Sequence, residues 1–239
     1  MKAEPIGNGC HVLVDDIHTF GTDAILLADF AAPKVKDTAC DLCTGCGIVP
    51  MLWAKNHAVS SVVGVELQSA AVQLFRQTIS ENQTETDVTA LHADLKELKG
   101  LLPFGGYDLV TCNPPYKAVG AGLQNVDAAV LLARHEVGCT LEDVIAAAAG
   151  LLRFSGRFCL CHRPERLTDI FCLMRKYKME PKRLRTVAKQ PGNAPWLVLV
   201  EGRLGGKSGL RIEPALYVEN GADFSEEMKR IYGNYKYDR

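Results

Sequence analysis

Hydrophobic and polar positions along the chain follow two alternating periods, which predict short strands separated by amphipathic helices. Strands are predicted at residues 38–42, 62–66, 88–92, 107–112, 157–162, 183–188 and 196–201. Helices are predicted at residues 24–30, 48–54, 69–79, 144–152 and 165–177, with Ser69 and Thr140 as candidate N-caps. This alternation implies an α/β fold whose sheet is mostly parallel and has helices on both faces.

The last two predicted strands are joined directly. Only residues 190–195, of sequence Q-P-G-N-A-P, separate them, so they are expected to pair antiparallel. The expected fold is therefore a seven-stranded, mostly parallel sheet with an antiparallel last strand. Residues 36–204 would form this domain. Residues 1–35 would form an N-terminal segment and a helix that packs over the ligand site. Residues 205–239 would form a C-terminal extension with a short helix after residue 224.

Composition places the chain among globular proteins, because 47% of its 239 residues are hydrophobic and 23% are charged. No apolar run approaches the ~18 residues of a membrane span, and no signal core follows the N-terminus, so a cytoplasmic protein is expected. The nine cysteines suit a reducing compartment without disulfides. A monomer is the default expectation.

The charge distribution is uneven along the chain. The net charge of −1 argues against binding to nucleic acid by bulk charge alone. Residues 153–189, however, contain eleven Lys or Arg against three acids, a local charge of +8. This stretch favours a phosphate-bearing partner, and the alternative is a solvated basic surface.

A glycine loop follows the first strand of the predicted sheet. Asp41, Gly45 and Gly47 have the spacing D-x-x-x-G-x-G, at the strand end where α/β sheets bind ligands. Pro50 stands where the dinucleotide fingerprint requires a third glycine, which argues against a pyrophosphate site. The pattern therefore indicates a nucleoside cofactor of another kind.

Acidic residues end the next two strands. Glu66 follows Gly47 by 19 residues and is placed to accept hydrogen bonds from two ribose hydroxyls. Asp94 is placed to accept from an adenine amino group, with Leu95 beside the ring. Either acid alone could simply be solvated, but with the glycine loop they predict one cofactor site.

Three cysteines in and beside the loop raise the alternative of a metal site. Cys40, Cys43 and Cys46 lack a fourth ligand, and closed zinc sites use two separated pairs. No metal is therefore expected. Cys43 and Cys46 are interpreted as small side chains filling a tight turn.

The motif N-P-P-Y at positions 113–116 follows the fourth strand. The side-chain oxygen of Asn113 and the carbonyl of Pro114 can each accept one N–H of a planar amine, which leaves the nitrogen lone pair aimed at a methyl donor. The prolines make this corner rigid, and Tyr116 would stack on an extruded base. The alternative is a Pro-Pro turn in which Asn113 caps locally and Tyr116 packs on a neighbour.

These motifs together resemble the Rossmann-like class I S-adenosylmethionine-dependent amino-methyltransferases. More narrowly, the chain resembles the bacterial family that methylates N6 of adenine-37 in valine transfer RNA. The resemblance is carried by residues 20–28, 41–50, 65–68 and 112–116, and also by residues 134–136 and 162–167. The family often has Gly or Ser where this chain has Cys43, a difference in side-chain size that leaves the backbone spacing unchanged.

The resemblance implies roles for individual residues. Catalytic roles are expected for Asn113, Pro114 and Tyr116. Contacts to S-adenosylmethionine are expected from Thr22, Asp23, Asp41, Thr44, Gly45, Gly47, Glu66, Leu67, Asp94, Leu95 and Asn113. Contacts to the substrate are expected from Pro115, Tyr116, Lys117, Arg134, Arg163 and Arg166. The expected partner is the anticodon loop of a transfer RNA, whose bases are already partly unstacked.

Other functions remain open at this point. The same N-P-P-Y corner serves enzymes that act on glutamine amide nitrogen, on DNA adenine and on ribosomal guanine. A non-catalytic RNA-binding protein could keep the fold, and an NAD-dependent oxidoreductase is disfavoured by Pro50 and by the N-P-P-Y motif.

Overall fold

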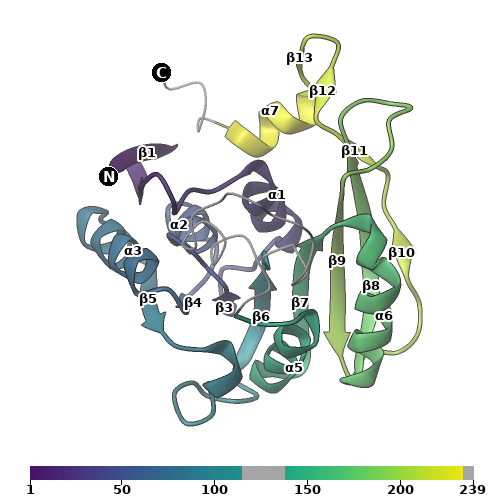
Figure 1. Ribbon diagram of the computed structural model, residues 1–239, viewed down its shortest axis with the longest axis horizontal. Helices are drawn as coiled ribbons and strands as arrows, with labels where there is room; N and C mark the ends of the chain where they lie inside the picture. Colours follow the sequence, from purple (N-terminus) through teal and green to yellow (C-terminus); the bar gives the residue numbers. More distant parts are fainter. Residues whose placement is uncertain (115–137, 234–239) are drawn as a thin grey trace, which may run out of the picture.

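The computed structural model describes residues 1–114 and 138–233, which build a central sheet with helices on both faces (Figure 1). The sheet has nine strands in the order β10-β8-β9-β7-β6-β3-β4-β5, and β11 also pairs with β8. Its longer strands are β3 (Thr38–Leu42), β4 (Ser61–Glu66), β5 (Asp87–His92), β6 (Tyr107–Cys112), β7 (Leu152–His162), β8 (Met179–Ala188) and β9 (Leu197–Leu204). These are the seven predicted strands, and the α/β, Rossmann-like fold class is confirmed. Two further strands at the edge, β10 (Arg211–Ile212) and β11 (Leu216–Tyr217), were not predicted.

The strand order places a ligand site at the middle of the sheet. From β3 the chain moves outward through β4 and β5, then returns to pair β6 with the other side of β3. Ligands bind at such a reversal, beyond the carboxyl ends of the strands. Only β9 runs against its neighbours, because it is antiparallel to both β7 and β8, as the short connection predicted.

The helices cover the sheet in two layers. On one face lie α1 (Thr22–Ala31), α2 (Ile48–Ala54) and α3 (Ser69–Glu81). On the other lie α5 (Leu141–Leu151) and α6 (Leu167–Lys176). The chain also contains two 3-10 turns, η1 (Leu95–Glu97) after β5 and η2 (Pro164–Arg166) directly before α6. Alternate strand residues enter the two cores, as a two-faced sheet requires: Leu109 packs with the first layer and Val110 with the second.

Of the two predicted N-caps, one is confirmed and one is wrong. Thr140 and Asp143 form the predicted capping box at the start of α5. Ser69 is the first residue of α3 and not its cap, since Gln68 occupies the cap position without a side-chain hydrogen bond. None of the described helices is both long and apolar enough to cross a membrane.

A hairpin that the pattern analysis missed precedes the domain. Strands β1 (Lys2–Gly7) and β2 (Cys10–Val14) pair antiparallel around Asn8 and Gly9, both of which have positive φ. Asn-Gly is the residue pair that such a tight turn prefers, so the signal was present in the sequence. The hairpin is fixed to α3, because the hydroxyl of Thr78 accepts a hydrogen bond from the N–H of Leu13 at 2.9 Å.

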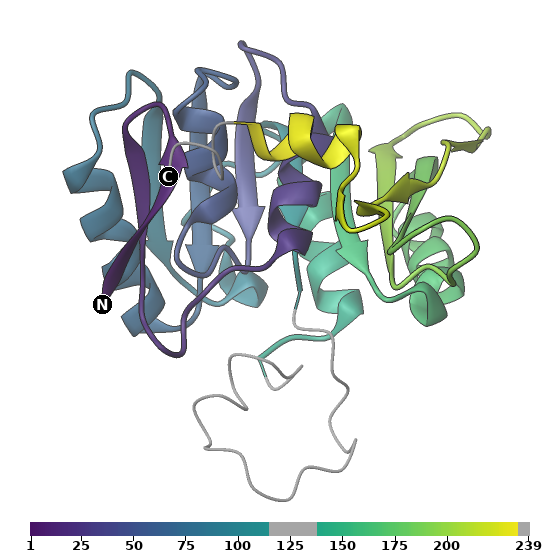
Figure 2. The same ribbon diagram turned by 90° about the horizontal axis from the view of Figure 1, so that it is seen from above.

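The C-terminal extension folds back onto α1. After the small hairpin of β12 (Glu219–Asn220) and β13 (Asp223–Phe224), helix α7 (Glu226–Tyr232) lies across α1 (Figures 1 and 2). The hydroxyls of Tyr232 and Thr22 are 2.7 Å apart, and Arg230 donates to both carboxylate oxygens of Asp29 at 3.0 and 3.2 Å. Helix α1 is thus covered on both sides. The division at residues 35 and 204 stays a prediction.

Candidate functional site

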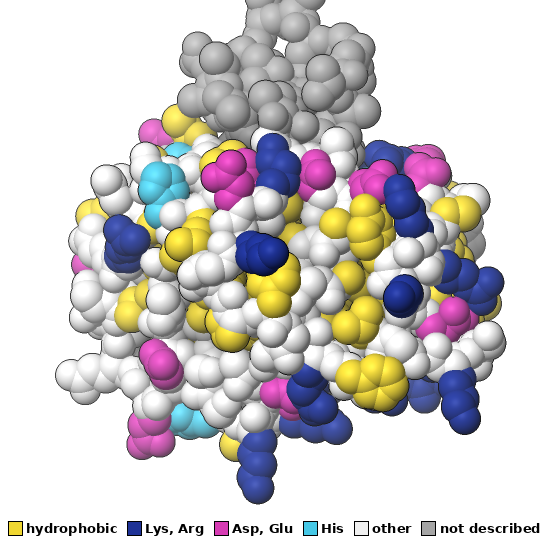
Figure 3. All heavy atoms as spheres, turned by 90° about the horizontal axis from the view of Figure 1, so that it is seen from below, with side chains coloured by type: hydrophobic (Ala, Val, Ile, Leu, Met, Phe, Trp, Pro, Cys, Tyr) yellow, Lys and Arg dark blue, Asp and Glu magenta, His cyan; other side chains and the backbone are white. Residues whose placement is uncertain are grey.

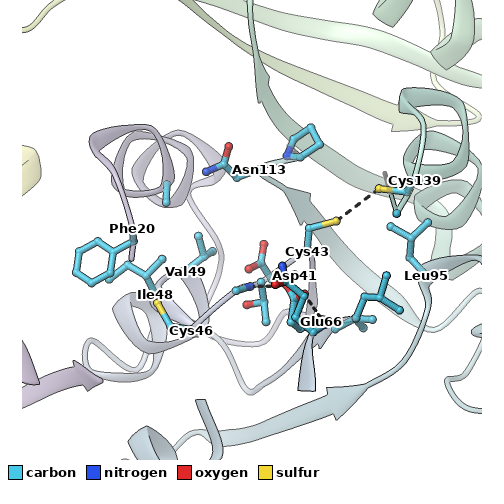
Figure 4. Close-up of a pocket in the computed structure, with 18 of the residues that line it drawn as sticks. Phe20, Asp41, Cys43, Cys46, Ile48, Val49, Glu66, Leu95, Asn113 and Cys139 are labelled. Carbon is cyan, nitrogen blue, oxygen red and sulfur yellow. Dashed lines mark hydrogen bonds between the residues drawn. The ribbon is translucent and has the colours of Figure 1, made fainter. Parts of the chain in front are cut away.

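A cavity of about 560 Å³ opens at the carboxyl ends of the central strands (Figure 4). The predicted site residues that line it are Asp23, Asp41, Thr44, Gly45, Glu66, Leu67, Asp94, Leu95, Asn113, Pro114 and Arg163. Asp41, Glu66 and Asn113 come from three neighbouring strands, β3, β4 and β6, whose pairing brings them around one space. The topology therefore brings together Asp41 and Asn113, which are 72 positions apart in the sequence.

The glycine loop turns sharply between β3 and α2. Cys43, Gly45 and Gly47 all have positive φ, of 55°, 58° and 86°. A Cβ at Gly45 would meet no atom within 4 Å, so this glycine leaves space on the side of the cavity that it lines. A Cβ at Gly47 would lie 2.0 Å from Cδ2 of Phe75, so Gly47 permits close packing of the loop on α3. Gly47 itself does not line the cavity.

Glu66 is held by the loop that it faces. Its Oε2 accepts a hydrogen bond from the N–H of Gly45, and its Oε1 accepts one from the N–H of Gln68, both at 2.9 Å. The residue is only 7% exposed. Because each carboxylate oxygen has two lone pairs, both oxygens keep the capacity to accept a further hydrogen bond from a ligand.

Asp41 is a buried carboxyl at the end of β3. Its Oδ1 accepts a hydrogen bond from the hydroxyl of Thr111 at 2.6 Å. Burial raises its pKa to about 7 and the charge of Glu66 acts in the same direction, whereas the hydrogen bond from the hydroxyl of Thr111 opposes the rise. This carboxyl therefore titrates near neutral pH, which the sequence did not indicate.

Asn113 is the first residue beyond β6. Its Oδ1 lies 3.1 Å from the Sγ of Cys161, a buried residue near the end of β7. The contact follows from the pairing of β6 with β7, in which Cys112 is opposite Leu160. Cys161 was not among the predicted site residues, because the sequence predicted a mostly parallel sheet and not which strands are neighbours in it.

Apolar and sulfur-containing side chains form much of the remaining wall. Phe20, Cys46, Ile48, Val49 and Cys139 line the cavity without having been assigned to it beforehand. The Sγ atoms of Cys43 and Cys139 are 4.0 Å apart (Figure 4). The three thiols of the loop region diverge, since Cys40 packs in the core under α5 and Cys46 in the core under α1.

Two acids at the edges of the cavity have local partners. Asp94 accepts a hydrogen bond from the backbone N–H of Lys96 at 2.9 Å. Its carboxylate also forms an ion pair with the ammonium group of Lys96 at 3.3 Å. Asp23, in the first turn of α1, accepts from the N–H of Ala24 at 3.0 Å. Leu95, beside Asp94, is 7% exposed, so the wall there is apolar.

Some predicted residues lie elsewhere. Thr22 does not line the cavity, and its hydroxyl is hydrogen-bonded to that of Tyr232 in α7. Arg166 also lies outside the cavity lining and pairs with Asp169 at 2.8 Å. Four further predicted residues fall outside the described part of the chain: Pro115, Tyr116, Lys117 and Arg134.

The cations of the basic stretch at residues 153–189 are largely paired with acids. Within the described part of the chain, at least eight of the eleven form ion pairs, mostly with acids from distant parts of the sequence. The pairs are Arg153–Asp108, Arg157–Asp37 and Glu201, Arg166–Asp169, Arg175–Glu180, Lys176–Glu142, Arg183–Glu201 and Glu213, Arg185–Glu227, and Lys189–Glu219. On the face in Figure 3, Lys and Arg likewise lie among Asp and Glu. The binding of a phosphate-bearing partner by this stretch stays a prediction, and of its cations Arg163 lines the cavity.

Comparison with known proteins supports the fold and the resemblance. A relative from Porphyromonas gingivalis, named tRNA1(Val) (adenine(37)-N6)-methyltransferase, is 28% identical over 189 residues, which span 77% of this chain and 73% of the relative. A ribosomal protein uL3 glutamine methyltransferase from Bordetella pertussis is 33% identical over 144 residues, 56% of this chain and 47% of the relative. The crystal structure of a predicted O-methyltransferase from Agrobacterium tumefaciens superimposes with a TM-score of 0.71 at 19% identity, over 90% of this chain and 97% of that one.

The family model with the description "Methyltransferase small domain" matches residues 15–164. This range contains the glycine loop, Glu66, Asp94 and the Asn113 corner, which are the parts of the structure that build the cavity. The chain belongs to the methyltransferase small domain family.

Proposed function

We propose that this protein is an S-adenosylmethionine-dependent methyltransferase that methylates the exocyclic N6 amine of an adenine in transfer RNA, adenine-37 of valine transfer RNA. The observation that carries the proposal is the position of Asn113. It borders the same cavity as Glu66 and Gly45, so an amine held by its carboxamide faces the cofactor.

The residues around the cavity fit S-adenosylmethionine. The two oxygens of Glu66 would accept hydrogen bonds from the ribose hydroxyls, and the carboxylate of Asp94 from the adenine amino group. Leu95 and Cys139 offer an apolar wall to the adenine ring, and Asp41 supplies negative charge. When bound, the cofactor supplies a methyl group on a positively charged sulfur. Thr22 and Gly47 do not line the cavity. They would support the site indirectly, Thr22 as the first residue of α1 and Gly47 as the last residue of the glycine loop before α2.

Asn113 and Pro114 would prepare the amine for attack. The Oδ1 of Asn113 and the carbonyl oxygen of Pro114 each accept one N–H, which withdraws the nitrogen lone pair from the ring and directs it at the methyl group. These acceptors also stabilise the positive charge that develops on the nitrogen. The methylated nitrogen then loses a proton to water, because an aromatic amine that carries a positive charge is strongly acidic.

Transfer RNA is proposed as the substrate on the names of several relatives, which are 27–28% identical to this chain. Arg163 lines the cavity next to Asn113 and Pro114 and would contact a phosphate of the anticodon loop. Stacking of the base on Tyr116, and contacts from Pro115, Lys117, Arg134 and Arg166, remain part of the proposal.

A second candidate is methylation of a glutamine side chain in a protein. It is favoured by the 33% identity to the uL3 glutamine methyltransferase from Bordetella pertussis. A glutamine amide, like an adenine amine, is a planar nitrogen with two N–H donors, so the same two acceptors at Asn113 and Pro114 would serve it.

Transfer of a labelled methyl group separates these candidates. Purified protein and labelled S-adenosylmethionine are incubated in three separate reactions, each with one substrate. The substrates are an unmodified valine transfer RNA transcript, the same transcript carrying guanine at position 37, and a glutamine-containing ribosomal protein. We expect label only in the first RNA, recovered as N6-methyladenosine after digestion. Label in the protein supports the second candidate, and no transfer to any of the three contradicts the proposed function.

The titration of Asp41 predicts a pH dependence of cofactor binding. A positively charged ligand favours the carboxylate, so with a pKa of about 7 the affinity for S-adenosylmethionine should rise about tenfold between pH 6 and pH 8. Without ligand the same group makes the free energy of unfolding decrease as the pH rises from 3.8 to about 7, because the folded state holds a proton that the unfolded chain has released.

Calorimetric titration of S-adenosylmethionine at several pH values measures this dependence. Asp41→Asn is the matched variant, since it keeps the shape of the side chain and removes its titration. We expect the variant to bind with weaker and nearly constant affinity over this range. An equally steep profile in Asp41→Asn would assign the titration to another group.

A further inference from the structure

We propose that Cys161 is a positioning residue for catalysis, whose thiol orients the carboxamide of Asn113 so that its oxygen faces the target amine. The inference rests on the proposed methylation of an amine at Asn113. It assigns a role to a strand residue that lies outside the cavity lining.

The contact itself is short and buried. The Sγ of Cys161 donates to the Oδ1 of Asn113 at 3.1 Å, and Cys161 is completely buried. A thiol is a weak donor in water, but a buried hydrogen bond has no competing solvent and is electrostatically stronger. The bond therefore acts on Asn113, whose side chain would hold the target amine.

A carboxamide can be placed in two orientations of nearly equal shape, with its oxygen and nitrogen exchanged. Only one of them is useful for this reaction, because the target amine donates hydrogen bonds and must meet the oxygen. An amide oxygen can accept more than one hydrogen bond. A donor to the Asn113 oxygen, the Cys161 thiol, selects the orientation in which the oxygen, and not the nitrogen, meets the amine.

The position of Cys161 in the sheet makes this donor rigid. Strand β7 lies between β6 and β9, and Cys161 is paired with Leu199 of β9. On the other side, the pairing of Cys112 with Leu160 sets the register between β7 and the strand that ends at Asn113. The thiol is therefore fixed by backbone hydrogen bonds on both sides and does not depend on a loop.

Strand β7 also supplies a matched control. Cys159 lies two residues before Cys161, points to the same face of the sheet and is equally buried, but its thiol is 3.8 Å from the carboxylate of Glu201. Cys161→Ala and Cys159→Ala remove the same sulfur atom from the same strand. They should lower thermal stability by similar amounts, and only one of them touches Asn113.

The test measures methyl transfer in three variants with the substrate that the wild type accepts. We expect Cys161→Ala to lower kcat about fivefold, the size of one neutral hydrogen bond, with KM for S-adenosylmethionine unchanged. Cys161→Ser keeps a donor at this position and should recover kcat to within about twofold of wild type, because a hydroxyl donates more strongly than a thiol. Cys159→Ala should keep the wild-type kcat.

A second measurement is independent of which amine is methylated. The side-chain amide signals of Asn113, identified by their loss in Asn113→Ala, are recorded by NMR without substrate. We expect them to shift or broaden in Cys161→Ala and to stay in place in Cys159→Ala. Unchanged signals, or equal kcat in Cys161→Ala and wild type, would overturn the inference, as would equal losses in the alanine and serine variants. Failure of the wild type to methylate any substrate would contradict the proposed function and leave the NMR result to decide the role of Cys161.

Discussion

Replacement of Asn113 by alanine is expected to lower kcat for methyl transfer by about 10²- to 10³-fold, the usual effect of removing one preorganised hydrogen-bonding group from a reacting centre. The variant loses the acceptor that would hold the amine while positive charge develops on its nitrogen. The affinity for S-adenosylmethionine should stay within about twofold of wild type, because Glu66 and Asp94 would carry most of the polar contacts to the cofactor. Single-turnover kinetics and calorimetry measure the two quantities separately.

Asn113→Asp is the control for this prediction. It keeps the shape of the side chain and an oxygen acceptor, and it replaces the amide nitrogen by a second oxygen that brings a negative charge. We expect it to retain more activity than Asn113→Ala. If Asn113→Ala keeps a third or more of the wild-type kcat, the carboxamide does not take part in the reaction.

The second large effect concerns folding. Gly47→Ala should lower the free energy of unfolding by about 3 kcal/mol, from the cost of a positive φ together with overpacking in a buried core. The new Cβ would lie 2.0 Å from the ring of Phe75, which is completely buried and cannot move into solvent. Urea unfolding followed by circular dichroism gives the difference from wild type.

Gly45→Ala separates the two causes. Gly45 also has a positive φ, but a Cβ there would meet no atom within 4 Å, so only the backbone cost of about 1 kcal/mol is expected. In the double variant with Phe75→Leu, Gly47→Ala should cost less than it does alone, since the ring that it strikes is smaller. Equal losses in the two glycine variants would show that the contact with Phe75 is unimportant.

The sequence predicted the central sheet because its long strands carry their own pattern. Strands β3 to β9 have five or more residues each, and apolar residues, consecutive or alternating with polar ones, indicate their approximate positions. Strands β10 and β11 have two residues each and no period, so they exist only through their pairing with β8. The hairpin β1–β2 was missed although its Asn-Gly turn is a local signal.

The candidate site was predictable to the extent that it depends on strand ends. Asp41 and Glu66 lie at the ends of predicted strands and Asn113 directly follows one, and the rule that ligands bind beyond the carboxyl ends brought them together. The roles of Cys161 and of the basic stretch depend instead on which strands are neighbours and which distant acids approach them. Arg185, for example, is paired with Glu227 of α7, a contact that no local pattern contains.

The contact between Thr22 and Tyr232 joins residues that are 210 positions apart, and this has a consequence for synthesis on the ribosome. Helix α1 leaves the exit tunnel early, with seven side chains that are buried in the folded protein. Of its partners, α2 follows soon after it in the sequence, whereas β7, β9 and α7 are translated much later. The described residues that line the cavity have all been translated once the ribosome has passed Arg163, whereas the face of α1 that contacts α7 stays uncovered until Tyr232 has been added.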